Sequence, residues 1–358
     1  MQEDLQYAVL HEFVAPAKRN LSRQTWDYLM GGAETETTYI RNRVAIDSMA
    51  FRPRVLRDVE KVDTGGTLLG QRLRIPVILA PIGSLQDIVA EGGLAPTRAA
   101  ARFGIMHMLS SVCSPGQKTV AAAVDHPKIF QLYVRGDHAW VDDQVAEAVA
   151  NGYVGVCLTV DLDYYGRRER DLAKRYKATA RRGPAADHFQ ARFSWADVER
   201  LRSKFAVPLV LKGIATAEDA KIAVEHGIRG VYVSNHGGRQ LDHGKGGLDV
   251  LPEVVDAVAG RAEVIVDGGF LRGTDIVKAM ALGARAVGIG RLQGLALAAG
   301  GESALVRALE LLEDEMRRCL GLLGVRSCAE LDGSYVARVS PLPREGFDSA
   351  FPLLKEGY

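Results

Sequence analysis

The sequence has few cysteines and no excess of positive charge, and each absence excludes a class of protein. Four cysteines occur among 358 residues, and none is spaced as CxxC, so neither a disulfide framework nor a zinc ribbon is expected. We expect buried thiols in a reducing compartment and no bound metal. Lys and Arg total 45 against 44 Asp and Glu, a net charge of +1, which lacks the basic bias of nucleic-acid-binding proteins.

Long apolar runs are absent as well. No run approaches the ~18 apolar residues of a membrane span. The first residues, Met1-Gln2-Glu3-Asp4, are polar and acidic, unlike a secretory leader. We therefore expect a cytoplasmic protein with neither a membrane span nor a nucleic-acid partner. The 38 glycines exceed the usual ~7% of residues, which indicates tight loops and close backbone approach to a ligand.

From residue 76 onward, eight short apolar runs alternate with amphipathic segments. Continuous apolar runs rich in β-branched residues are typical of parallel strands buried on both faces. Eight such strands with helices between them predict a (β/α)8 TIM barrel, in the α/β class. The predicted strands are Pro76–Ile82, Met106–Ser111, Ile129–Val134, Val154–Asp161, Pro208–Ile214, Gly230–His236, Glu263–Gly269 and Ala286–Arg291. The turn Ala80-Pro81-Ile82-Gly83 lacks the GxGxxG pattern, which argues against a dinucleotide-binding domain.

The remaining chain is predicted to flank the barrel. We assign residues 1–75 to an N-terminal extension of helices and a hairpin, 76–330 to the barrel, and 331–358 to a tail on the surface. Ser22 is predicted to cap a helix that ends at Gly31-Gly32, and Ser303–Gly324 to form a last long helix. The basic stretch after Arg168 favours a solvated loop over the barrel mouth; the alternative is a site for an acidic partner.

Polar residues gather where the predicted strands end, which is where barrel enzymes place their catalytic groups. Asp267-Gly268-Gly269 and Gly290-Arg291 follow strands seven and eight, and glycine N–H groups with an arginine favour a phosphate-bearing ligand there. His236 follows strand six, with Arg239 three residues later. His can take a proton near neutral pH, and Arg can hold a carboxylate through two hydrogen bonds. Asp161 is placed to stabilise the imidazolium, and Lys212 to stabilise an anionic reduced cofactor.

With these motifs the sequence resembles the FMN-dependent 2-hydroxy acid oxidases and dehydrogenases, the family of glycolate oxidase, lactate oxidase, mandelate dehydrogenase and flavocytochrome b2. The most specific motif is Ser-Asn-His-Gly-Gly-Arg-Gln at 234–240. It is supported by Trp26-Asp27-Tyr28, Phe51-Arg52-Pro53-Arg54, Gln131-Leu132-Tyr133, Thr159-Val160-Asp161, Gly166-Arg167-Arg168 and Lys212-Gly213.

The resemblance implies an FMN cofactor, a homotetramer and a role for each matching residue. His236 would be the base, Asp161 its partner, and Tyr133, Arg239 and Lys212 further catalytic residues. Tyr28, Arg168, Arg239 and Tyr133 would bind the substrate. The cofactor would be held by Ala80, Pro81, Ile82, Gly83, Ser110, Gln131, Thr159, Lys212, Ser234, Asp267, Gly268, Gly269, Arg272, Gly290 and Arg291. The family oxidises an (S)-2-hydroxy acid to the 2-keto acid, and oxygen, a quinone or a redox protein then reoxidises the flavin.

The sequence departs from the family pattern at several positions. Leu271 stands where the family has a phosphate-binding Arg, so that phosphate ligand is either lost or replaced from a shifted register by Arg272, which is assigned to the cofactor site. Val112 replaces an aromatic residue of glycolate oxidase-like members, and Gly83 replaces Ala. Leu162-Asp163 replaces Thr-Pro, and the segment between Arg168 and Lys212 is shorter than in many relatives. These changes predict a more open pocket, a smaller lid, and a substrate bulkier than lactate.

Other functions stay open at this point. One is an FMN barrel enzyme acting on an amine or a carrier-bound acid in a biosynthetic pathway. Another is a non-redox FMN isomerase, although the His236 and Arg239 pair suits a carboxylate better than a diphosphate. A third is a non-catalytic barrel used for binding or assembly, which the retained charged residues at the barrel mouth argue against.

Overall fold

The computed structural model describes residues 6–182, 189–342 and 346–357. The acidic N-terminus considered above therefore lies outside the described residues. Eight parallel strands close into a barrel, with the last strand paired to the first. The barrel strands are β4 (Val77–Leu79), β5 (Met106–Ser110), β6 (Ile129–Leu132), β7 (Gly155–Thr159), β8 (Leu209–Ile214), β9 (Gly230–Val233), β10 (Glu263–Val266) and β11 (Ala286–Ile289). All eight predicted strands and the barrel are confirmed.

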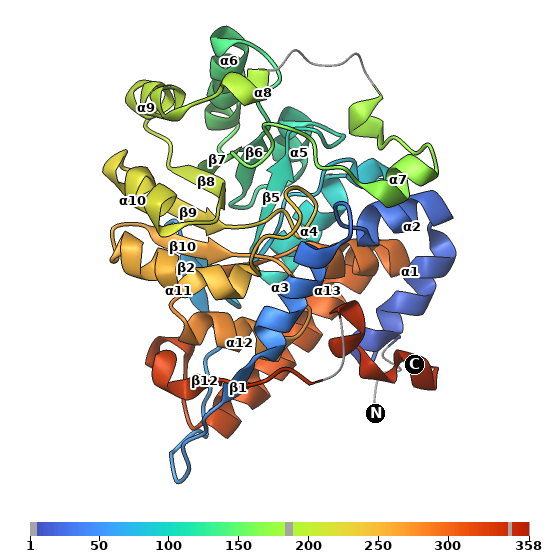
Figure 1. The fold of residues 1–358 in the computed structure, drawn as a ribbon, viewed down its shortest axis with the longest axis vertical. Helices are drawn as coiled ribbons and strands as arrows, with labels where there is room; N and C mark the ends of the chain where they lie inside the picture. The colour runs from blue at the N-terminus through green and yellow to red at the C-terminus, as the bar shows by residue number, and fades with distance from the viewer. Residues whose placement is uncertain (1–5, 183–188, 343–345, 358) are drawn as a thin grey trace.

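Helices surround this barrel (Figure 1). Most of them alternate with the strands, as the periodicity predicted. The helices after β4 are α4 (Leu94–Phe103), α5 (Gln117–Ala123), α6 (His138–Ala150), α7 (Glu169–Ala173), α8 (Phe189–Arg192), α9 (Trp195–Lys204), α10 (Ala217–Glu225), α11 (Gly247–Val258), α12 (Gly273–Ala281) and α13 (Arg291–Leu323). In the described part of the chain, no helix is both long and apolar enough to cross a membrane.

The last helix is longer than predicted. The apolar pattern indicated a helix over Ser303–Gly324, whereas α13 already begins at Arg291, directly after β11. Gly300 and Gly301 have non-helical backbone angles and divide α13 into two parts. The predicted segment corresponds to the second part, which packs its apolar face on the barrel helices α4 and α12.

The N-terminal extension supplies helices and two short sheets. α1 (Val14–Asn20), α2 (Arg23–Met30) and α3 (Thr37–Asp47) precede β1 (Met49–Phe51) and the hairpin of β2 (Gly66–Leu68) with β3 (Gln71–Leu73). The Ser22 side chain accepts a hydrogen bond from the Thr25 N–H, which confirms the predicted helix cap.

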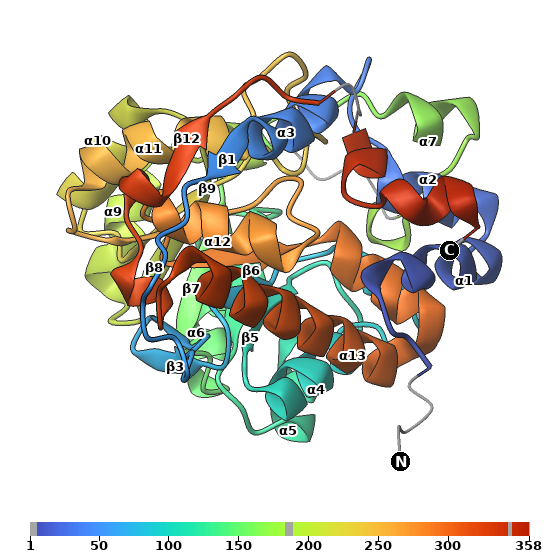
Figure 2. The ribbon, with the colours of Figure 1, turned by 90° about the horizontal axis from the view of Figure 1, so that it is seen from below.

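The tail returns to the extension, an arrangement that the sequence did not indicate. β12 (Val336–Arg338) pairs antiparallel with β1, and Figure 2 shows the two strands side by side. The short helix η6 (Gly346–Ser349) packs on α3. All four cysteines are buried and free, as predicted.

Candidate active site

A cavity of about 1100 Å³ lies at the carboxyl ends of the barrel strands. Its walls include the turns after β4, β5, β6, β7, β9, β10 and β11, and it is also lined by residues of α2, α3 and the segment that follows α7. This is the end of a barrel at which catalytic groups gather.

His236 lies at the centre of a short chain of polar contacts in this cavity. Its Nδ1 is 3.0 Å from Asp161 Oδ1, and its Nε2 is 3.3 Å from the Tyr133 hydroxyl oxygen. His236 has a φ of +58°, which lies in the left-handed region. Few histidines adopt this conformation, and here it belongs to the tight turn after β9. Because Asp161 holds one ring nitrogen, the other faces Tyr133 and the cavity.

The electrostatic surroundings keep this imidazole neutral at pH 7. Burial lowers the pKa of His236 from 6.5, Asp161 opposes that shift, and the Lys212 charge adds to it. Burial alone would raise the pKa of Asp161, but His236 and Lys212 outweigh it and the pKa falls. The pair is therefore neutral histidine beside carboxylate, the state in which histidine can accept a proton.

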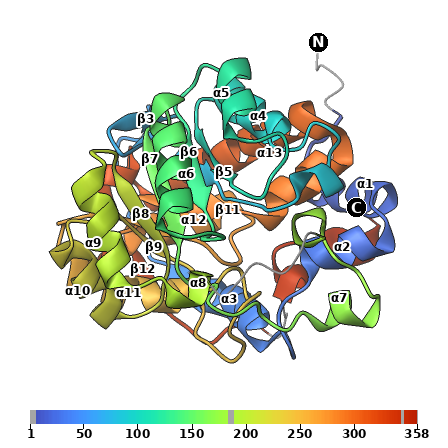
Figure 3. The same ribbon diagram turned by 90° about the horizontal axis from the view of Figure 1, so that it is seen from above.

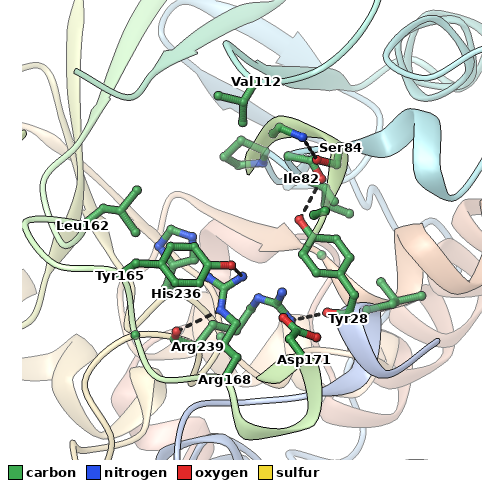
Figure 4. Close-up of a pocket in the computed structure, with 18 of the residues that line it drawn as sticks. Tyr28, Ile82, Ser84, Val112, Leu162, Tyr165, Arg168, Asp171, His236 and Arg239 are labelled. Carbon is green, nitrogen blue, oxygen red and sulfur yellow. Dashed lines mark hydrogen bonds between the residues drawn. The ribbon is translucent and has the colours of Figure 1, made fainter. Parts of the chain in front are cut away.

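Two guanidinium groups face the same part of the cavity. Arg239 donates from Nη1 to the carbonyl oxygens of Tyr28 (2.6 Å) and Gly31 (3.0 Å), and its guanidinium lies 4.9 Å from the centre of the Tyr28 ring. Arg168 donates from Nε to the Arg239 carbonyl oxygen and contacts the Tyr165 ring and hydroxyl. Figure 4 shows both arginines beside His236 and Tyr28.

The carboxylate of Asp171 lies near this cationic pair. Burial raises the pKa of Asp171, and the arginines only partly offset that effect. Burial and the neighbouring Arg239 lower the pKa of Arg168 to about 10, so Arg168 remains charged at pH 7. Two charged guanidiniums with one carboxylate leave a net positive site, which suits the carboxylate of a small acid.

A second polar cluster belongs to the cavity wall: Lys212 and Asp267 line the cavity, and Ser234 is buried between them. Lys212 Nζ donates to Ser234 Oγ at 2.9 Å, Ser234 Oγ donates to Asp267 Oδ1 at 2.7 Å, and the Asp267 carboxylate lies 3.8 Å from Lys212. Burial would lower the pKa of Lys212, but Asp267 and Asp161 raise it overall, so the ammonium stays charged. This gives the cavity a fixed positive charge on β8.

The third cluster leaves a buried acceptor without a partner. Gln131 donates from Nε2 to Thr159 Oγ1 at 2.8 Å, while its fully buried Oε1 has no hydrogen-bond partner in the structure. Ser110 is buried on the neighbouring strand β5. A buried carbonyl oxygen without a donor is costly unless a bound molecule supplies one.

Glycines and one arginine line the far end of the cavity. Gly268 and Gly269 have φ values of +102° and +85°, and a Cβ at Gly290 would meet no atom within 4 Å. Arg291 begins α13 and donates to the carbonyl oxygens of Gly237, Met30 and Gly31. Open backbone at a helix N-terminus beside an arginine suits a phosphate group.

The residues present therefore fit FMN. The unpaired Gln131 oxygen can accept from the flavin ring, Lys212 can face its pyrimidine side, and the Gly290-Arg291 end can hold the ribityl phosphate. No cluster of His, Cys, Asp and Glu that could hold a metal is found within the described residues.

Arg272 requires a correction. Its side chain forms an ion pair with Glu315 on α13 and donates to the Ala350 carbonyl oxygen of the tail, and it does not line the cavity. The preceding residue, Leu271, is 4% exposed and lines the cavity instead. The shifted-register expectation for Arg272 therefore disagrees with the structure, because the half-buried Glu315 carboxylate, outside the cavity, pairs with the guanidinium.

The structure brings together the other predicted residues, either on the cavity wall or directly beneath it. Ser110, Gln131, Thr159 and Ser234 are buried under the wall, Asp161 contacts His236 without lining the cavity, and the rest line it. The sequence did not indicate Tyr39, Arg43, Ser84, Tyr165, Asp171 or Phe347, which also line the cavity. These side chains come from the extension, the tail and loops, whose paths are not set by strand order.

The segment after Arg168 also differs from a plain solvated loop. It contains α7, α8 and α9, and α7 lies beside α2 (Figure 3). Three of its basic residues, Arg175, Lys177 and Arg181, line the cavity. It therefore forms part of the pocket wall.

Comparison with known proteins finds one family model, described as FMN-dependent dehydrogenase, that matches residues 17–338. Glycolate oxidase of Spinacia oleracea is 37% identical over 350 residues, covering 92% of this chain and 95% of the relative. 2-Hydroxyacid oxidase 2 of Rattus norvegicus is 38% identical over 343 residues, covering 91% and 97%.

Solved structures agree with these matches. A crystal structure of mandelate oxidase superposes with a TM-score of 0.87 at 36% identity, covering 94% of this chain and 100% of the other. A soluble mutant of the membrane-associated (S)-mandelate dehydrogenase from Pseudomonas putida superposes with a TM-score of 0.87 at 33% identity, covering 92% and 99%. The barrel, the cavity and the polar clusters are thus found in a chain similar to these enzymes throughout its length.

Proposed function

Since this chain belongs to the FMN-dependent dehydrogenase family, we propose that it oxidises an (S)-2-hydroxy acid with a side chain larger than that of lactate to the 2-keto acid. The observation that carries the proposal is the His236–Asp161 pair, 3.0 Å apart, in the same cavity as the guanidinium groups of Arg168 and Arg239. A base and a carboxylate site in one pocket are what the oxidation of a 2-hydroxy acid needs.

The roles of the residues follow from their contacts. Arg168 and Arg239, with Tyr28 beside them, hold the substrate carboxylate and so fix the orientation of the α-carbon. The oxidation removes two electrons and two protons from the substrate, and His236 accepts one of these protons at Nε2. Asp161 stabilises the resulting imidazolium, and Tyr133 donates to the substrate oxygen. Bound FMN would supply the acceptor for the two electrons and for the second proton.

The lining of the cavity supports a substrate with a bulky side chain. Val112, Leu162 and Tyr165 line the wall near His236 and Tyr28 (Figure 4), so this wall is largely apolar and aromatic. Gly83 opens less space than the sequence suggested. The Val112 side chain already occupies that space, since a Cβ added at Gly83 would lie 2.9 Å from Val112 Cγ2. The solved relatives are named for mandelate, whose side chain is a phenyl ring.

An anaerobic titration of the purified flavoprotein tests the proposal. The visible spectrum is recorded with glycolate, (S)-lactate, a branched aliphatic (S)-2-hydroxy acid and (S)-mandelate. We expect bleaching of the flavin band, fastest with the larger acids. His236→Asn should keep the bound-FMN spectrum and lose about 10²–10⁴-fold in reduction rate. Rapid reduction of that variant, or no bleaching by any acid in the wild type, would contradict the proposal.

Oxygen is the proposed electron acceptor, because several relatives are named oxidases. Readmitting oxygen to the reduced enzyme should restore the flavin band and produce one hydrogen peroxide per keto acid. Reoxidation by a quinone or a cytochrome but not by oxygen would make the enzyme a dehydrogenase. The sequence-based expectation of a homotetramer is tested separately by sedimentation.

A further inference from the structure

The outer wall of the cavity is a segment whose backbone-to-backbone hydrogen bonds, within the described residues, are all local, such as Tyr176 N–H to the Asp171 carbonyl oxygen and Arg181 N–H to that of Ala178. Residues 175–181 follow α7 and contain only the three-residue helix η3 (Thr179–Arg181). Six of the seven line the cavity. The position of this wall therefore depends on side-chain hydrogen bonds to a neighbouring element.

The neighbouring element is the turn after β4. Asp87 in this turn accepts most of the hydrogen bonds that the segment donates to it. The Asp87 carboxylate accepts from the Tyr176 hydroxyl at 3.0 Å, from the Thr179 N–H at 2.9 Å and from the Thr179 hydroxyl. Ser84 Oγ accepts a fourth hydrogen bond, from the Ala180 N–H at 2.9 Å. Hydrogen bonds to a charged carboxylate are stronger than neutral ones, so Asp87 carries most of this attachment.

The same turn is attached to the substrate side of the pocket. Tyr28 donates its hydroxyl to the Gly83 carbonyl oxygen at 3.0 Å, and Ser84 donates its N–H to the Val112 carbonyl oxygen. Ser84 has a φ of +57° and is fully buried, so its conformation is held by these contacts. The turn is thus a rigid base for the wall.

Attachment of the wall also places two side chains against residues of the carboxylate site. The Tyr176 ring centre lies 5.8 Å from that of Tyr28. The Arg181 guanidinium lies 3.4 Å from the centre of the Tyr165 ring, and the same ring contacts Arg168. Release of the segment would remove the support behind both Tyr28 and Arg168.

We propose that Asp87 is a positioning residue for substrate binding: it holds residues 176–181 closed over the pocket and so orients Tyr28 and Arg168 toward the substrate carboxylate. This proposal depends on the proposed function only in that the substrate carboxylate binds at Tyr28 and Arg168. Asp87 is absent from the cavity wall, so it acts through the segment and not on the substrate itself.

The helix α7 and Lys174, which follows it, have separate anchors, which limits what Asp87 controls. Arg170 pairs with Glu36 at 2.5 Å, and Lys174 pairs with Asp27 on α2. Removal of the Asp87 carboxylate should therefore free residues 176–181 while α7 stays in place. Because the His236 cluster is not attached to this segment, the chemical step should change little.

The test compares Asp87→Ala with Glu91→Ala, which removes an exposed carboxylate from the same connection. If the closed wall is populated about 10–100-fold less in Asp87→Ala, KM for the best 2-hydroxy acid rises by about the same factor. The flavin reduction rate at saturating substrate should stay near that of the wild type. Glu91→Ala should match the wild type in both quantities.

Limited trypsin digestion gives a readout that does not depend on activity. Cleavage after Arg175, Lys177, Arg181 or Arg182 should be faster in Asp87→Ala and unchanged in Glu91→Ala. Wild-type KM and wild-type digestion in Asp87→Ala would overturn the proposal, as would a fall in the saturating rate at unchanged KM.

A double variant guards against misfolding of Asp87→Ala. If Asp87→Ala lacks bound flavin, the double variant Tyr176→Phe/Thr179→Val, which removes two of the donors to Asp87, replaces it with the same expected and overturning results. If no 2-hydroxy acid reduces the wild-type flavin, the proposed function fails. The digestion rates still decide whether Asp87 holds the segment.

Discussion

At the scale of single residues, the buried charge on Asp161 governs how His236 works. A neutral imidazole at pH 7 is ready to accept a proton, but the imidazolium formed in a buried site needs a counter-charge. Asp161 supplies it at 3.0 Å and also fixes which ring nitrogen faces the cavity. The carboxylate therefore affects both the rate of proton transfer and the pH at which the base is lost.

The pH profile of the wild type and Asp161→Asn separates these effects. Burial lowers the pKa of His236 below 6.5, so wild-type kcat/KM should be level at pH 7 and fall only as the pH drops through that lower pKa. Asn removes the charge that opposes the shift, so the acid limb should move to still lower pH while the rate falls by about 10²–10⁴-fold. An acid limb that moves upward would show that Asp161 does not face the catalytic histidine.

At the scale of elements, a buried ion pair joins the N-terminal extension to the barrel. Arg43 on α3 contacts Asp275 on α12 at 2.6 Å, with side chains only 6% and 2% exposed. The same guanidinium donates to the Gly269 carbonyl oxygen at the cavity wall. This pair thus fixes α3 against the loop that forms the phosphate end of the cavity.

Asp275→Asn should therefore destabilise the protein by about 3–5 kcal/mol, because it leaves the Arg43 charge buried with a weaker partner. Urea unfolding of the FMN-loaded protein measures the change. Asp47→Asn is the matched control, since Asp47 bonds the same guanidinium but is 19% exposed, and a smaller loss is expected. Equal losses in the two variants would mean that the burial of Asp275 contributes nothing.

The elements also show how far the sequence determines the fold and the site. Strand order and the polar residues at strand ends follow from local patterns, so the barrel and the grouping of His236, Asp161 and Lys212 were predictable. The β1–β12 pairing and the Arg272–Glu315 ion pair were not, because each joins segments hundreds or tens of residues apart through tertiary contacts alone. The segment with Tyr176 and Arg181 was predicted to lie over the barrel mouth, but its contacts with the turn after β4 were not, for the same reason.

At the scale of the whole molecule, the cavity joins parts of the chain that are far apart in sequence. Its lining includes Tyr28 on α2, the ends of all eight barrel strands, and Phe347 in the tail. A ligand that fills it contacts the extension, the barrel and the tail at once. Binding of FMN should therefore stabilise the entire fold, since only the folded chain can bind it.

Thermal and urea unfolding of the apoprotein with FMN or riboflavin tests this coupling and the phosphate end together. At FMN concentrations ~100-fold above Kd, the free energy of unfolding should rise by about 2.7 kcal/mol. Riboflavin at the same concentration should stabilise less, because it lacks the phosphate that Gly290 and Arg291 can hold. Arg272→Met should leave this difference between the two flavins intact, since Arg272 pairs with Glu315 outside the cavity. Loss of the difference in Arg272→Met would instead show that Arg272 binds the FMN phosphate.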